Sequence, residues 1–213
     1  YKTNYTYNAD GQVLSCTKDG TQVFSNTYDD QGRLISQKDA EPSHNSGTFT
    51  YDDISSPGEL ITTYTDRNGN SKVYVYNADY HLLSEIDETG STTSYTYDNE
   101  GNRTSMTDAM GNTTSYTYDS RGNLLTVTDP DGNVTTMAYD DRNNVLFVQN
   151  AAGKTMTYTY DNRNNLLRQT DPEGNMTSFT YNGDGFKLSK TTPAGTTSYT
   201  YENGRLDTVT DPL

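Results

Sequence analysis

A tyrosine followed by Asp, Asn or Glu recurs about every 21 residues, usually as the second member of an aromatic-x-Tyr pair. Successive anchor tyrosines are 21, 23, 25, 21, 21, 21, 21, 21 and 20 residues apart. A fixed period of this length means that one small structural unit is used repeatedly, so it constrains the fold more than composition does. The ten anchors are Tyr7, Tyr28, Tyr51, Tyr76, Tyr97, Tyr118, Tyr139, Tyr160, Tyr181 and Tyr201.

The two longest spacings fall in an irregular region around residues 40–70. Two tracts rich in Pro, Ser and Gly lie there, EPSHNSG at 41–47 and ISSPGE at 54–59. Such tracts are typical of loops. We therefore expect lengthened loops between otherwise ordinary repeats.

Each period contains two turn motifs and two strand-like segments. After Tyr118 the sequence reads DSRGN, and half a period later DPDGN begins at Asp129. Asp at the start of a turn accepts hydrogen bonds from nearby backbone amides, Gly takes the left-handed conformation, and Pro suits the second turn position. The segments between turns, such as NTTSYTY and NLLTVT, are rich in Thr, Tyr, Val and Leu, which favours strands.

Aromatic and hydroxyl-bearing side chains alternate along these segments. Frequent Gly and Pro exclude long helices, and the motifs of leucine-rich and calcium-binding solenoids are absent from the sequence. Short turns join antiparallel strands, so we predict an all-β fold made of ten consecutive hairpins, about twenty strands. In the segment 92–97, alternation places Thr93, Tyr95 and Tyr97 on one face and Thr92, Ser94 and Thr96 on the other.

Composition alone gives conflicting indications of whether the chain is disordered or folded. The chain has 30% hydrophobic residues and a formal charge of −14, values typical of disordered segments. Its 19 tyrosines oppose that interpretation, because aromatic rings at alternating positions supply buried area that an aliphatic count misses.

The charge balance excludes some classes of protein. With 29 acidic against 15 basic residues, the chain lacks the cationic surface that nucleic-acid binding requires, so we predict no nucleic-acid partner. No apolar run is long enough to cross a bilayer and the first residues do not resemble a signal peptide, so we predict no membrane insertion. A single cysteine, Cys16, excludes an internal disulfide.

The combined motif, Tyr-Asp-x-x-Gly-Asn-Leu followed by Asp-x-x-Gly-Asn and the next Tyr-x-Tyr-Asp, resembles the YD repeat of the Rhs family. The resemblance covers essentially the whole chain, is clearest in YTYDSRGNLLTVTDPDGN at 116–133 and is weakest between residues 43 and 71. It implies a long ribbon of antiparallel hairpins that curls into an open spiral or a barrel-like shell segment. Bacterial members of the family enclose a toxic C-terminal segment in their shell, and in teneurins the shell supports cell-surface adhesion.

The resemblance leads us to expect a non-enzymatic structural module, part of an Rhs-type shell that encapsulates a C-terminal toxin cargo. The parent would be a secreted or cell-surface bacterial protein. The alternative hypothesis is a cell-surface adhesion or carbohydrate-binding module whose aromatic face holds glycans or a receptor.

We treat residues 1–213 as one YD-repeat domain, irregular around 40–70. The last motif, TDPL, stops before its glycine, so we expect a fragment of a longer shell. Unpaired strands at the edges of a sheet tend to pair with other chains. The expectation is therefore an open curved strip that self-associates through its edge strands.

Some repeats depart from the family pattern. Tyr80, Asn143 and Asn164 replace the glycine of the first turn, and asparagine tolerates the left-handed conformation better than tyrosine does. The family's self-cleaving Asp-Pro-x-Gly junction has counterparts in DPDG at 129–132 and DPEG at 171–174. Both fall on the second turn and further repeats follow, so we predict no cleavage at either.

No residue is predicted to be catalytic, cofactor-binding or metal-ligating. Asp129, Asp131 and Asn133 have the spacing of calcium ligands but lack the central Gly and distal Glu of an EF-hand loop, so we interpret them as turn formers. His44 and His81 lack the spacing of zinc ligands and are expected on loops or the surface. Cys16 stands where later repeats carry Met or Val, which indicates a small core residue rather than a nucleophile.

Overall fold

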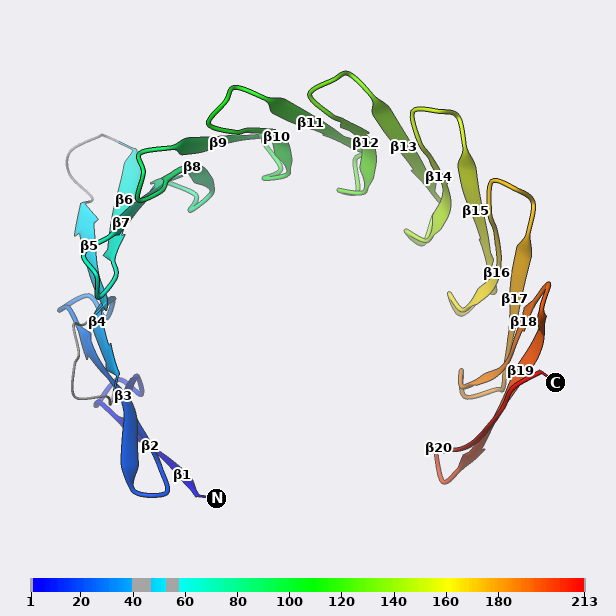
Figure 1. Cartoon of the computed structure of the whole chain (residues 1–213), viewed down its shortest axis with the longest axis horizontal. Coiled ribbons are helices and arrows are strands. Elements are labelled where there is room, and N and C mark those ends of the chain that lie inside the picture. The colour runs from blue at the N-terminus through cyan, green and yellow to red at the C-terminus, as the bar shows by residue number, and fades with distance from the viewer. Residues whose placement is uncertain (1, 40–46, 53–57, 213) are drawn as a thin grey trace. The chain divides into compact units, whose positions relative to one another are not determined.

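The computed structural model describes residues 2–39, 47–52 and 58–212. His44 and residues 54–57, predicted to lie in lengthened loops, fall outside the described residues. The described chain contains twenty β-strands and no helix, which confirms the predicted all-β fold (Figure 1). Among these residues, none forms a helix that is long and apolar enough to span a membrane. The strands divide into two compact units, Tyr1–Asn112 and Thr113–Leu213.

In the first unit, every strand pairs in antiparallel fashion with its neighbours in the chain within that unit. This is the pattern of successive hairpins joined by tight turns. The strands described in this unit are β1 (Thr3–Tyr7), β2 (Val13–Lys18), β3 (Thr21–Tyr28), β4 (Leu34–Asp39), β5 (Gly47–Asp52), β6 (Glu59–Thr65), β7 (Ser71–Asn77), β8 (Leu82–Ile86), β9 (Thr92–Tyr97) and β10 (Arg103–Thr107).

The second unit has the same neighbour-to-neighbour antiparallel pairing. Its strands are β11 (Thr113–Tyr118), β12 (Leu124–Thr128), β13 (Val134–Tyr139), β14 (Val145–Gln149), β15 (Thr155–Tyr160), β16 (Leu166–Thr170), β17 (Met176–Tyr181), β18 (Lys187–Thr192), β19 (Gly195–Glu202) and β20 (Arg205–Thr210).

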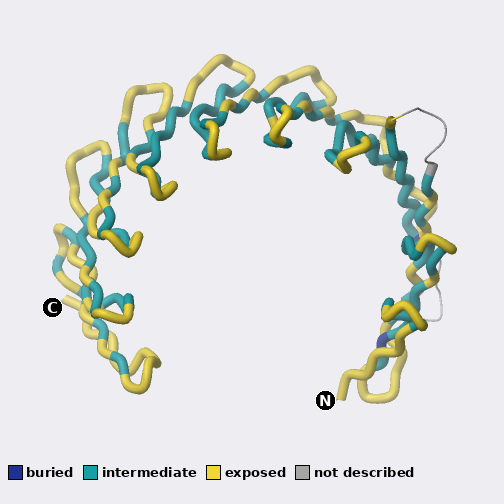
Figure 2. The backbone as a smooth tube through the Cα atoms, turned by 180° about the vertical axis from the view of Figure 1, so that it is seen from behind, coloured by how far each residue is buried: buried dark blue, intermediate teal, exposed yellow. Residues whose placement is uncertain are grey.

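The predicted alternation of faces is present in the strands. In β11 the tyrosines Tyr116 and Tyr118 are half-buried, whereas the alternating residues Thr113, Ser115 and Thr117 are exposed. A sheet that carries no second layer buries few side chains completely, and Figure 2 shows mostly intermediate and exposed positions. Among the described residues only one hydrophobic side chain, that of Cys16, is buried, with 4% of its surface exposed.

Two rows of turns connect the strands. We call the turns that follow an anchor tyrosine first turns and those half a period later second turns. The five-residue first turns of the second unit are 119–123, 140–144, 161–165 and 182–186, and its five-residue second turns are 129–133, 150–154 and 171–175. In these turns the fourth residue donates its backbone NH to the carbonyl of the first, and the first donates to the carbonyl of the fifth. This is the hairpin loop in which a turn is followed by a left-handed residue.

A bulge next to the anchor tyrosine was not predicted from the sequence. In the β11–β12 hairpin, Thr117 faces Thr126 but Tyr118 faces Leu124, so one residue of β12 is left unpaired. The same register shift accompanies the anchors of β13, β15, β17 and β19. The second-turn hairpins described in this unit keep a regular register. Because bulges increase local twist, we expect extra twist beside the first turns.

Candidate functional site

Each five-residue first turn among the described residues begins with an Asp or Asn, whose side chain accepts hydrogen bonds from the rest of the turn. In turn 119–123, Asp119 Oδ1 accepts the backbone NH groups of Arg121 and Asn123, both at 2.9 Å. The other carboxylate oxygen, Oδ2, accepts the side-chain amide of Asn123 at 2.9 Å. Arg121 Nη2 also pairs with Oδ2 at 3.2 Å, so one carboxylate satisfies four donors and a single aspartate fixes the turn.

These hydrogen bonds lower the pKa of the turn aspartates. The side-chain amide of Asn123, assisted by backbone NH groups, lowers the pKa of Asp119 to about 2, because each donor stabilises the ionised carboxylate. The equivalent amide bonds hold the pKa of Asp140 and Asp161 below the ordinary value. Carboxylates in this state act as fixed hydrogen-bond acceptors, which suits a structural role.

Asparagine side chains link neighbouring first turns in the second unit. Asn123 Nδ2 donates to Asn143 Oδ1 at 2.8 Å, and Asn144 Nδ2 donates to Asn164 Oδ1 at 2.9 Å. Asn143 and Asn164 are the residues that replace the turn glycine, and they adopt φ values of 65° and 66°. Their side chains thus provide acceptors that glycine lacks, which gives these two departures from the repeat a structural reason.

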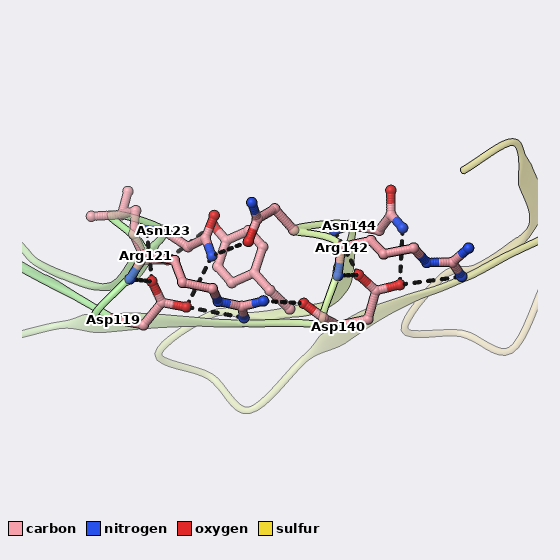
Figure 3. Close-up of polar contacts among 9 residues, drawn as sticks. Asp119, Arg121, Asn123, Asp140, Arg142 and Asn144 are labelled. Atoms are coloured by element: carbon pink, nitrogen blue, oxygen red, sulfur yellow. Dashed lines mark hydrogen bonds and ion pairs between the residues drawn. The ribbon is translucent and has the colours of Figure 1, made fainter. Parts of the chain in front are cut away.

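Arginine side chains make a second link between first turns. Arg121 Nη1 donates to the carbonyl oxygen of Asp140 at 2.9 Å (Figure 3). Arg163 Nη1 likewise donates to the carbonyl of Gly183 in the next first turn. The third position of a first turn therefore lies within reach of the backbone of the following first turn.

The anchor tyrosines tie each hairpin to the preceding one. The hydroxyl of Tyr139 donates to the carbonyl of Leu124 at 3.0 Å, and that of Tyr181 donates to the carbonyl of Leu166 at 2.9 Å. Donor and acceptor are 15 residues apart in both pairs. Burial raises the pKa of both hydroxyls. These half-buried tyrosines, whose hydroxyls are hydrogen-bonded, therefore hold neighbouring repeats together.

The second turns contain the residues with calcium-ligand spacing. Asp129 Oδ1 accepts the backbone NH groups of Asp131 at 3.0 Å and Asn133 at 2.8 Å, and Oδ2 accepts the Asn133 amide at 2.9 Å. This geometry confirms the interpretation of these residues as turn formers. No group of three or more His, Cys, Asp or Glu side chains suited to a metal ion occurs in the described part of the chain.

The two Asp-Pro-x-Gly tetrapeptides, DPDG and DPEG, occupy equivalent second turns. Asp171 accepts the backbone NH groups of Glu173 and Asn175 and the Asn175 amide, as Asp129 does with its own partners. Each tetrapeptide is followed by a further strand, β13 or β17. Their placement in ordinary turns agrees with the sequence interpretation, and the predicted lack of cleavage stays a prediction.

The remaining sequence candidates are dispersed. Cys16 lies buried in β2, as expected of a core residue. His81 ends turn 77–81 and is half-buried, with its ring stacked on Tyr97 at 4.7 Å between centroids. Tyr80, in the same turn, has a φ of 62° and a side chain that is 76% exposed. Cys16 and His81 thus lie in different hairpins.

Sequence reasoning did not identify the contacts between repeats. The asparagine at the fifth turn position was part of the motif, yet its bond to the first-position carboxylate was not inferred. In the regular repeats, the offset of 15 residues between an anchor tyrosine and the residue after the preceding first turn was readable from the period. Only the structure shows that the tyrosine hydroxyl donates to the carbonyl of that residue.

Comparison with models of protein families shows which family the chain belongs to. The RHS repeat model matches residues 76–113, 101–134, 118–155, 139–176 and 160–197, which together make up more than half of the chain. The chain belongs to the RHS repeat family. The model of the teneurin YD-shell matches residues 1–91 of this RHS repeat protein, which includes the irregular region around 40–70.

Solved structures support the fold of the RHS repeats. The crystal structure of TcdB2-TccC3 has a TM-score of 0.58 and 14% identity, and the match covers 97% of this chain and 15% of that one. The Tc holotoxin pore of Photorhabdus luminescens has a TM-score of 0.59 and 14% identity, with 97% and 14% covered. The RHS repeat chain thus spans about one seventh of the structures it matches. No curated protein matches its sequence significantly.

Proposed function

We propose that the chain is a wall segment of a β-shell that encloses a polypeptide toxin cargo, encoded C-terminal to it in the full-length protein. The observation that carries the proposal is the match of the fold, over 97% of the chain, to Tc toxin structures that contain TcdB2 and TccC3. The catalytic activity would then belong to the cargo, and the repeats themselves would be structural. The parent would be a secreted bacterial protein.

The contacts of the repeats suit a wall. The interior strands of each unit pair on both sides, so few backbone donors and acceptors remain free within a unit. Side-chain links between first turns and tyrosine bonds between hairpins add stiffness across the strands. The candidate side chains that were considered for chemistry are instead used in turns or packing.

Adhesion and carbohydrate binding, the alternative hypothesis, remains a prediction. Its strongest support was the face of regularly spaced tyrosines. The hydroxyls of anchor tyrosines such as Tyr97 and Tyr139 donate to backbone carbonyls, and their rings are half-buried. This arrangement explains the tyrosine pattern by packing between repeats.

Protease protection of the cargo in the full-length protein tests the proposal. A proline at Thr159, in the middle of β15, removes a donor from the ladder and opens the sheet there. Ala151→Pro is the matched control, because Pro130 and Pro172 occupy the same position in the neighbouring second turns. We expect the cargo to resist protease in the wild type and in Ala151→Pro and to be digested in Thr159→Pro.

Two results would contradict this proposal. Rapid digestion of the cargo in the folded wild-type protein would show that the wall does not enclose it. Equal protection in Thr159→Pro, with the opened sheet verified by hydrogen exchange of β14–β16, would show that protection comes from another part of the protein.

A further inference from the structure

Two shallow cavities occupy equivalent positions in the two units. In the second unit, a cavity of ≈ 540 Å³ lies between the first turns 161–165 and 182–186, and Arg163 lines it. In the first unit, a cavity of ≈ 440 Å³ lies between the first turns 77–81 and 98–102, and Asp79 lines it. Both residues hold the third position of their turn, 84 positions apart, which is four periods of 21 residues.

In the second unit, an arginine of the chain itself occupies the third turn position and bridges the two turns that border the cavity. The guanidinium of Arg163 donates to the carbonyl of Gly183, across the space between the two turns. Arg121 makes the corresponding bond to the carbonyl of Asp140 at 2.9 Å. A guanidinium between successive first turns is thus a recurring element of this fold.

The first-unit cavity carries the opposite charge at that position. Asp79 replaces the arginine; its backbone NH donates to Asn77 Oδ1, but its carboxylate has no hydrogen-bond or ion-pair partner among the described residues. Asp98 and Asn99 line the opposite wall, and they hold the first and second positions of their turn, as Asn182 and Gly183 do in the turn that accepts the bond from Arg163. Tyr95 and Tyr97 supply aromatic surface in the same cavity.

These features together fit a guanidinium that comes from outside the chain. A planar guanidinium pairs with a carboxylate, donates to backbone carbonyls and packs on aromatic rings. Tyr95 already has one guanidinium over its ring, because Arg103 lies 5.7 Å from the ring centroid. The formal charge of −14 further favours a cationic ligand.

We propose that the cavity lined by Asp79, His81, Tyr95, Tyr97 and Asn99 binds an arginine side chain of a polypeptide partner. The partner's guanidinium takes the place that the repeat's own arginine holds in the second unit. Tyr80, which is 76% exposed beside the cavity, is available to contact the residues that flank this arginine. The proposal stands whether or not the chain encloses a cargo.

An NMR titration tests the proposal on the chain itself. The probe is N-acetyl-arginine amide at low ionic strength, and N-acetyl-citrulline amide is a control of nearly the same shape without the charge. We expect saturable shifts of the backbone amides of Asp79 and Asn99 with the arginine probe. Binding of the citrulline probe should be at least about ten times weaker, because its ureido group cannot pair with a carboxylate as an ion.

Three variants locate the binding. Asp79→Asn should weaken the arginine probe several-fold, and Asp79→Arg should abolish its binding by supplying the repeat's own guanidinium. Asp10→Asn is the matched control, because Asp10 holds the same position in turn 8–12, where Gln12 already donates to the carbonyl of Gly32 at 2.5 Å. Unchanged resonances elsewhere in each spectrum verify that the variants are folded.

Three results would overturn the proposal. Equal shifts with the citrulline probe would do so, since they would point to a polar ligand such as a sugar. Shifts of similar size at all acidic turns would also do so, because they would reflect general attraction to a negative chain. An Asp79→Asn variant that binds as the wild type does would exclude this cavity.

Discussion

In the second unit, the first and second turns share one backbone geometry but differ in their surroundings. Turn 119–123 and turn 129–133 are closed by the same backbone bonds and the same Asp–Asn clamp. First turns are also joined to one another by amide and guanidinium bonds and adjoin a bulge. The second turns 150–154 and 171–175 are joined by an ion pair, Lys154–Glu173 at 2.7 Å, whose side chains are 59% and 57% exposed.

The difference shows that one local motif serves two tasks. The Asp–Asn clamp makes the hairpin, and it works wherever the five-residue motif occurs. The links between first turns join a fifth-position Asn to a fourth-position Asn, or a third-position Arg to a backbone carbonyl, and the third and fourth positions are the ones that vary within the motif. We therefore expect the first-turn row to contribute more to stability than the second-turn row.

Acid should have the largest effect on thermal stability, because it protonates the turn aspartates that close the turns of both rows. The pKa of the turn aspartates is lowered in the folded state, so the folded chain binds protons less tightly than the unfolded chain. Their stabilisation is fully present above about pH 4 and is lost as the pH falls toward the folded value, about 2 for Asp119. We expect Tm to fall by more than about 10 °C between pH 5 and pH 2.

Calorimetry between pH 7 and pH 2 measures this dependence. Little change is expected between pH 7 and pH 5, where these aspartates are ionised in both states. A Tm that stays constant down to pH 2 would mean that the clamps contribute nothing to stability, and the shared part of the comparison would be wrong.

Removing the fifth-position asparagine should separate the two rows. Asn123→Ala removes the bond to Asp119 and the bond to Asn143, whereas Asn133→Ala removes only the bond to Asp129. We expect Tm to fall by about 4–8 °C in Asn123→Ala and by about half as much in Asn133→Ala. Equal decreases in thermal unfolding experiments would show that the link between first turns carries no weight.

Removing an anchor hydroxyl should have an effect of similar or smaller size. Tyr139→Phe leaves the carbonyl of Leu124 without this donor, which costs about 1 kcal/mol in the free energy of unfolding. Tyr158→Phe is the control, because no hydrogen bond from the Tyr158 hydroxyl occurs within the described residues. Chemical denaturation measures the stability of both variants. Equal stability of the two would show that the Tyr139 hydrogen bond does not stabilise the contact between hairpins.

The same tyrosine should make stability sensitive to alkali. Burial raises the pKa of Tyr139 in the folded state, so its stabilisation is complete below about pH 10 and decreases as the pH rises through the folded value. Tyr139→Phe should therefore lose less stability than the wild type when the pH is raised from 9 to 11.

The ion pair between second turns should have the smallest effect. Lys154 and Glu173 are both largely exposed, and exposed pairs contribute little and are screened by salt. We expect Lys154→Gln to change Tm by less than about 1 °C, and less still in 0.5 M salt. Arg121→Gln, which loses a bond to a backbone carbonyl, should lower Tm more at either salt concentration. If Lys154→Gln lowered Tm more than Arg121→Gln, the second-turn row would contribute more to stability than the first-turn row, contrary to our expectation.

The strands, the alternation of faces and the turn positions could be predicted because they depend on local chemistry. Tyr116 and Tyr118 lie on the half-buried face as the period-2 pattern indicates, and the glycines of the turns have positive φ. Asn143 was correctly expected to tolerate the left-handed conformation. Each of these features requires knowledge of only a few consecutive residues.

The contacts between repeats could not be predicted in the same way. The Asn123–Asn143 bond joins residues 20 apart, and its existence depends on how far successive hairpins are rotated. The bulge sets part of that rotation, and no residue type at the anchor signals it. His81 lies at the end of a turn, as expected, but the packing of its ring on Tyr97 from the next hairpin was not predicted. These features follow from three-dimensional register rather than from local propensity.

The pairing of strands only with their chain neighbours has a consequence for folding. All the pairings within each unit join segments that are close in sequence, and such a topology has a low contact order and favours rapid folding. Any hairpin can nucleate, and the next strand then adds to an existing edge, as in other repeat proteins. A growing polypeptide can therefore fold behind the ribosome, one hairpin after another. Under mechanical tension the same order runs in reverse, and the hairpins peel from an edge one at a time.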